Sequence, residues 1–153
     1  MAWLLMGEKL KTQDKLNAWD INAGLATVCS FFYTTADSHE HLFFLCPYAM
    51  QVWRFAKGFI DIPSTGSTWK DVVQDFSHVI HRKTMNAIVA KLLFGASVYY
   101  IWQERNARLF SRKSRSPKDV CDLIYSTVRL KIMAIRWKDS SRVRNMKIVW
   151  KVS

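Results

Sequence analysis

The sequence predicts an all-α fold, in which a small irregular part near the N-terminus precedes a bundle of long amphipathic helices. Half of the 153 residues are hydrophobic, which is enough to bury a substantial core. Apolar residues recur at helical spacing in the stretches after residue 68, and a serine–proline pair marks the start of a further helix. These features argue against intrinsic disorder over most of the chain.

The first sixty residues contain short elements. We expect one helix at the extreme N-terminus and a second that begins at Thr12, a suitable cap, and runs to about Trp19. Residues 27–38 lack a helical period and are expected to form a loop with short extended pieces. From about Ser38 the chain is expected to be helical again, with Pro47 in the first turn of the continuing helix.

A linker is expected at residues 61–67, which contain the run Pro-Ser-Thr-Gly-Ser. Thr68 is suited to cap the helix that follows it. Apolar residues then recur three, four, seven and eleven positions after the first, at Trp69, Val72, Val73, Phe76 and Ile80. This spacing predicts an amphipathic helix.

Two longer helices complete the predicted bundle. One runs from about Lys83 to Phe110, with an apolar stripe formed by Ile88, Val89, Leu92, Ala96, Tyr99 and Tyr100. The other begins at Ser116, because serine caps helices well, Pro117 fits the first helical position, and Asp119 can answer the cap from the third. We expect it to end near residue 138, and the basic tail at 139–153 is left without an assigned structure.

The basic residues are concentrated in the second half of the chain. Residues 1–80 contain six Lys or Arg and eight Asp or Glu, a net charge of −2, whereas residues 81–153 contain seventeen and four, a net charge of +13. Such asymmetry predicts a polyanionic partner, either nucleic acid or an anionic membrane surface. The alternative is a basic surface that serves only solubility.

The sequence disfavours both a membrane-spanning helix and secretion of the protein. The apolar stretch from Met85 to Trp102 contains Asn86 and Lys91, so we expect a buried helix there rather than a membrane span. Three cysteines do not make a disulfide framework, and their odd number favours a reducing compartment. The apolar start of the chain is too short for a signal peptide, so we expect a nuclear or cytoplasmic protein.

The densest basic cluster lies at the junction of the two longest predicted helices. Arg105, Arg108 and Arg112 are three and four positions apart, so they are expected to share a helix face that could follow a phosphate backbone. The candidate nucleic-acid contacts are Arg105, Arg108, Arg112, Lys113, Arg115, Lys118, Arg129 and Lys131. A solvated helix end, where cations also favour the helix dipole, is the alternative interpretation.

Cysteine and histidine cluster between residues 29 and 46 in a pattern typical of a zinc site. Zinc prefers four sulfur or nitrogen ligands, which short pairs supply from two chain segments. His41 and Cys46 form one such pair, with four residues between them. The other pair retains Cys29, but Phe32 stands where its second cysteine belongs. His39 is the nearest candidate substitute, although its place two residues before His41 would require an irregular backbone.

These residues and their neighbours resemble the zinc-binding domain that follows the reverse transcriptase in plant non-LTR (LINE-type) retrotransposons. The matching segments are Ala2–Leu5, Cys29, His41–Pro47 and Val52-Trp53, and Ile101–Phe110 and Ser116-Pro117 resemble the C-terminal region of such elements. The resemblance implies metal ligands at Cys29, His41 and Cys46, with the fourth replaced by Phe32. We expect Phe32 to pack in place of the metal, so that zinc binding is weak or lost.

The resemblance divides the chain into four segments. Residues 1–60 would be a knuckle domain truncated at its N-terminus, 61–67 the linker, 68–138 the helical region and 139–153 the basic tail.

No catalytic motif accompanies these features. The sequence has no Gly-rich phosphate loop, no nucleophile elbow and no paired aspartates of the polymerase type, so we expect no enzyme and no small-molecule substrate. The leading prediction is a retrotransposon-derived domain that binds RNA or DNA with low specificity. The alternatives are a domesticated or newly emerged protein-interaction module, which would use the Trp-rich helices, and a decayed element copy without function.

Overall fold

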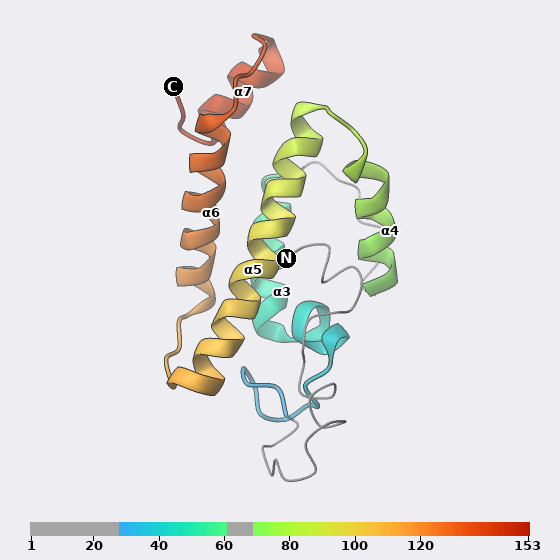
Figure 1. The fold of residues 1–153 in the computed structure, drawn as a ribbon, viewed down its shortest axis with the longest axis vertical. Coiled ribbons are helices and arrows are strands. Elements are labelled where there is room, and N and C mark those ends of the chain that lie inside the picture. The colour runs from blue at the N-terminus through green and yellow to red at the C-terminus, as the bar shows by residue number, and fades with distance from the viewer. Residues whose placement is uncertain (1–27, 61–68) are drawn as a thin grey trace.

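The computed structural model describes residues 28–60 and 69–153, and within these ranges the fold is helical (Figure 1). The elements are the π-helical turn η1 (His41–Leu45) and the α-helices α3 (Pro47–Lys57), α4 (Trp69–Ile80), α5 (Met85–Ser111), α6 (Pro117–Ala134) and α7 (Ser141–Val149). The described ranges contain no strand, only an isolated bridge between Val28 and Ala36. The predicted all-α fold is therefore confirmed. The helices expected before residue 27, the linker at 61–67 and the cap at Thr68 lie outside the described residues.

The core lies where α5, α6 and α3 meet. Helices α5 and α6 run antiparallel, side by side, and α3 packs against both of them (Figure 1). Leu93 and Ile101 of α5, Ile124 of α6 and Val52 of α3 are each fully buried in this cluster. Helix α4 covers another side of α5, where the ring of Phe76 stacks on that of Phe94 at a centroid distance of 4.1 Å. A single hydrophobic cluster thus unites the short N-terminal elements with the long helices.

The buried face of α5 is broader than the predicted stripe and turned away from it. Val89 is buried as expected, but Tyr99 is 42% exposed and the other four members of the stripe are only partly buried. The fully enclosed residues include the small Ala87, Ala90 and Ser97. Because α5 is covered from several sides, small residues are needed where neighbouring helices approach closely, and hydrophobicity alone does not reveal them. By length and composition α5 could cross a membrane, with a mean hydropathy of 1.3 over 18 residues, 44% of them buried here.

Helix α6 begins with the predicted capping box. The Ser116 hydroxyl accepts a hydrogen bond from the amide of Asp119 at 3.2 Å, and the Ser116 amide donates to the Asp119 carboxylate at 2.9 Å. The helix ends at Ala134, four residues before the expected end. There Ile135 takes up an extended backbone, and the indole of Trp137 donates to the carbonyl of Ile132 at 2.9 Å.

Replacing Ser116 with alanine is expected to lower the free energy of unfolding by about 1 kcal/mol, because the first turn of α6 loses its cap. Urea denaturation followed by circular dichroism measures this. Ser126→Ala is the control, since Ser126 is exposed in the middle of α6 and its change should stay within about 0.5 kcal/mol. Equal losses in the two variants would show that the cap does not stabilise the helix.

The C-terminal tail is part of the folded structure. Ser140 caps α7 by accepting a hydrogen bond from the amide of Val143 at 3.2 Å. Val143, Met146 and Trp150 are buried, and the Trp150 ring stacks on that of Tyr125 with centroids 5.1 Å apart. The Tyr125 hydroxyl also donates to the Trp150 carbonyl. The tail, to which the sequence assigned no structure, therefore contains a helix that is docked against α6.

Candidate metal centre

Three side chains with metal-binding atoms meet at the end of the molecule where η1 leads into α3. Cys29 lies at the start of the loop closed by the Val28–Ala36 bridge, His41 opens η1, and Cys46 directly precedes α3. All three are buried, and one ligand atom from each lies within 4.8 Å of the others. The Cys29 and Cys46 sulfurs are free thiols 3.8 Å apart. Tetrahedral zinc with Zn–S bonds of about 2.3 Å places two sulfurs at roughly this separation.

The loop around Cys29 is tightly folded. The Cys29 amide donates to the carbonyl of Thr35 at 2.7 Å, and the Tyr33 amide donates to the carbonyl of Cys29 at 2.8 Å. Tyr33 adopts a left-handed backbone with φ of 54°, as a turn of this kind requires. The turn directs the amides of Phe31 and Phe32 at the Cys29 sulfur. Amide donors of this kind stabilise a thiolate ligand.

Cys46 ends one helical element and caps the next. Its amide donates to the carbonyl of His41 at 2.8 Å, and its own extended backbone then breaks the helix before Pro47. The amides of Tyr48 and Ala49, in the first turn of α3, act on the Cys46 sulfur. The sulfur therefore sits where the N-terminus of a helix favours negative charge.

The two cysteine thiols influence each other's pKa in opposite directions. A hydrogen bond from the Cys46 thiol, helped by the amides of Phe31 and Phe32, lowers the pKa of Cys29 to about 5. The neighbouring Cys29 sulfur and burial raise the pKa of Cys46 well above its ordinary value. These surroundings favour a thiolate at Cys29, the form in which cysteine binds metals.

His41 supplies the third donor. Its backbone amide is fixed by the Ser38 hydroxyl at 3.1 Å. Its ring nitrogen Nε2 is buried and has no hydrogen-bond partner among the residues that the structure describes. A buried polar atom without a partner is costly, and a metal ion would satisfy it. Two sulfurs and an imidazole nitrogen at these separations form a donor set that fits zinc.

Neither Phe32 nor His39, the two residues considered for the fourth ligand position, lies in this group. Phe32 is 48% exposed, so the expectation that it packs in place of the metal is wrong. The aromatic that packs is its neighbour Phe31, which is 7% exposed and stacks on Tyr48 with ring centroids 4.3 Å apart. His39 is also buried, but its ring lies against Phe43 and is not among the three grouped ligands. Among residues 28–60 and 69–153 the centre therefore offers three protein ligands.

Residues 1–53 match the family described as zinc-binding in reverse transcriptase. The match spans about a third of the chain and contains Cys29, His41 and Cys46. The predicted resemblance to a reverse-transcriptase zinc-binding domain is confirmed by it. No curated protein and no solved structure matches the chain.

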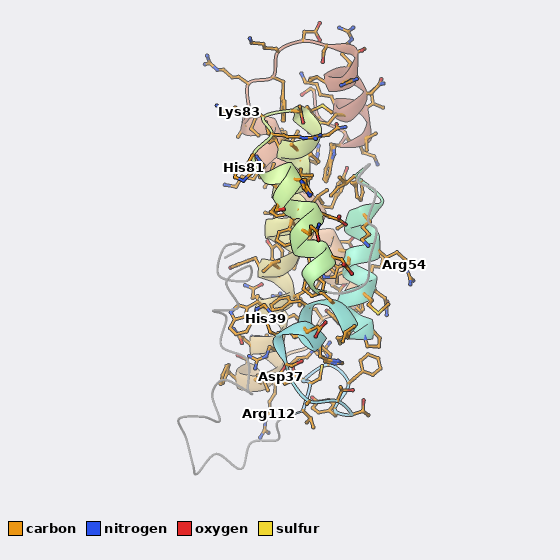
Figure 2. The ribbon with its side chains drawn as sticks, turned by 90° about the vertical axis from the view of Figure 1, so that its right-hand side faces the viewer. Asp37, His39, Arg54, His81, Lys83 and Arg112 are labelled. Carbon is orange, nitrogen blue, oxygen red and sulfur yellow. The ribbon has the colours of Figure 1, made fainter. Side chains whose placement is uncertain are left out.

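A buried ion pair joins the loop that carries Cys29 to α5. The Arg105 guanidinium donates to the Asp37 carboxylate from Nη2 at 2.5 Å and from Nε at 3.2 Å, and both side chains are 1% exposed. Asp37 lies at the same end of the molecule as Arg112 (Figure 2). Arg105 also lies over the ring of Trp102. The prediction that Arg105 contacts nucleic acid is therefore wrong, because its guanidinium is buried and paired with Asp37.

Arg108 is likewise engaged within the protein. Its guanidinium lies over the rings of Phe31 and Tyr48, 4.9 Å from each centroid. It donates to Glu104 at 2.8 Å and to the carbonyl of Arg115 at 3.0 Å, which leaves the side chain 16% exposed. Arg105, Arg108 and Arg112 thus do not form an open basic face. The spacing of Glu104 and Arg108, four apart on a helix, is a sequence pattern from which their pairing could have been predicted.

The other predicted nucleic-acid contacts lie at or near the surface. Arg112, Lys113, Arg115, Lys118 and Lys131 are exposed, and Arg129 is half-buried. Arg129 donates to the carbonyl of Lys151 at 2.8 Å, and Lys118 pairs with Asp122 at 2.9 Å. The exposed side chains remain candidates. They divide between the α5–α6 turn and the far end of α6.

Proposed function

We propose that this chain is a non-catalytic nucleic-acid-binding module in which the zinc-binding region stabilises one end of a basic helical domain. The observation that carries the proposal is that the acidic side chains in residues 81–153 are already bound to other groups of the protein. All four are engaged with groups of the protein: Glu104 with Arg108 and the Arg115 amide, Asp119 with Ser116, Asp122 with Lys118 and Asp139 with Arg144. The net charge of +13 already counts these four carboxylates, and in addition Asp37 pairs with one of the cations, Arg105.

Two groups of exposed cations are best placed to contact phosphates. Arg112 and Lys113 lie in the turn between α5 and α6, and Arg136, Lys138 and Arg142 lie between α6 and the first turn of α7. None of these five has an ion-pair partner among residues 28–60 and 69–153. Multiple cations of this kind bind phosphate backbones and carry little sequence information, which favours RNA or DNA bound with low specificity.

Zinc would serve this module as a structural cross-link. Cys29, His41 and Cys46 would hold it, and the metal would tie the loop at 28–36 to η1 and to the start of α3. With three protein ligands the affinity should lie below that of a complete four-ligand site. An origin in a retrotransposon accords with the family match of residues 1–53.

The proposal predicts a salt-dependent interaction that follows the unpaired cations. Fluorescence anisotropy with labelled single-stranded RNA should give a linear fall of log affinity with log salt concentration. Arg136→Ala combined with Lys138→Ala should reduce the slope by about 1.4, the loss of two phosphate contacts on a single strand.

The matched control combines Lys118→Ala with Arg144→Ala. It removes the same amount of charge, but from cations that are already paired with Asp122 and Asp139. The control should alter the slope clearly less. Binding that is insensitive to salt, or absent with both RNA and DNA, would contradict the proposed function.

A further inference from the structure

A pocket of about 310 Å³ lies between α7, the first turns of α5 and the residues that follow α3. Phe59, Val89 and Met146 contribute to its apolar walls, and the buried Trp150 also lines it. The neighbouring Val149 is 55% exposed, so the pocket opens to solvent. It is distinct from the metal centre and contains none of the proposed zinc ligands.

Polar groups on this pocket are few and are placed at its mouth. Asn86 of α5 and Asn145 of α7 both line the pocket and are exposed, and Arg142 lies one turn before Asn145. Carboxamides both donate and accept hydrogen bonds, as the edge of a nucleobase does. Apolar walls with a hydrogen-bonding rim suit a flat heteroaromatic ring, and the volume is at the small end for ligand pockets. A single base fits this chemistry, whereas a helix or a duplex does not.

The surroundings of the pocket carry positive charge. Arg142 is on the rim itself, and Arg136 and Lys138 lie in the segment leading into α7. Lys83 and His81 lie at the opposite end of the molecule from Arg112 (Figure 2), and Lys83 is exposed just before the first turn of α5. Helix α7 lies at this same end, beside the start of α5 (Figure 1). A strand whose phosphates meet these cations would bring its bases to the pocket.

We propose that this pocket receives one unpaired base of a single-stranded nucleic acid while the cations around it hold the adjoining phosphates. The inference rests on the proposed nucleic-acid binding and adds a position and a strand preference to it. Unpaired bases can turn away from their neighbours and enter such pockets, which bases in a duplex cannot do without first being unstacked.

The test compares two adjacent positions on α7. Val149→Trp would fill the pocket, whereas Ile148→Trp adds the same side chain at a residue that is 74% exposed and does not line it. The probes are a labelled twelve-nucleotide single-stranded RNA, an abasic strand of the same length, and the corresponding duplex. The wild type should bind the RNA about fivefold or more tightly than the abasic strand, as expected for one stacked base.

Val149→Trp should abolish this preference without changing the salt slope, and Ile148→Trp should retain it. Asn145→Ala provides a second variant at an exposed position in case Val149→Trp fails the folding check by circular dichroism. Equal binding of the RNA and the abasic strand by the wild type would overturn the proposal that the pocket receives a base, while leaving the proposed function intact. Failure of every probe to bind would overturn both.

Discussion

Replacing Arg105 with methionine is expected to lower the free energy of unfolding by about 3–5 kcal/mol, the cost of breaking a buried ion pair from one side. The substitution leaves the Asp37 carboxylate enclosed without the guanidinium that binds it through two nitrogens. The carboxylate cannot gain solvent in exchange, because it is 1% exposed. Urea denaturation, followed by circular dichroism, measures the loss.

Two further variants make this measurement decisive. Arg54→Met removes an arginine from the exposed face of α3 (Figure 2) and should change stability by no more than about 0.5 kcal/mol. Combining Arg105→Met with Asp37→Leu should recover most of the loss, because an apolar pair often replaces a buried ion pair at little cost. A loss for Arg105→Met no larger than that for Arg54→Met would show that the ion pair does not hold the two parts together.

The second large effect concerns the missing ligand. Phe32→Cys is expected to raise the affinity for zinc by roughly 100-fold or more, since disturbing groups that only orient the ligands already costs 10- to 100-fold. Phe32 is 48% exposed, so its removal should cost the fold little. Its amide already points at the Cys29 sulfur, which is the turn geometry that a cysteine three residues on would use.

Zinc affinity is measured by competition with a chromophoric chelator, and metal content by elemental analysis. Phe32→Ser is the control, because it removes the aromatic ring without adding a thiolate. It should bind zinc as the wild type does. If Phe32→Cys and Phe32→Ser have the same affinity, position 32 does not reach the metal.

Local chemistry made much of the helical fold predictable. The capping box at Ser116 and the amphipathic spacing before Ile80 depend only on neighbours along the chain, and both helices appear where these patterns placed them. Helix α7 was missed because its charged residues dominate the pattern. The spacing of Val143, Met146 and Trp150, three and then four apart, would have indicated its buried side.

The sequence predicted those parts of the site whose residues lie close together along the chain. Cys29, His41 and Cys46 lie within eighteen residues of one another, and their spacing was enough to group them. The partner of Arg105 lies 68 positions away, and a helical period cannot reveal a pairing of that range. Arginine is mostly exposed and is rarely buried unless it is paired, so the sequence favoured an exposed Arg105. Arg105 is an exception because Asp37 pairs with it.

The ion pair between Asp37 and Arg105 also shows that the end of the family match is not the end of the folded unit. The family match ends at residue 53, inside α3, yet residues before that point depend on α5 and α6 for their burial. A fragment cut after residue 60 would carry every proposed zinc ligand, but it would expose Val52 and lose the Arg105 guanidinium that binds Asp37. The segment that matches the family is thus smaller than the segment over which the buried cluster extends. An excised version of residues 1–53 would therefore need α5, which carries Arg105, in order to keep these contacts.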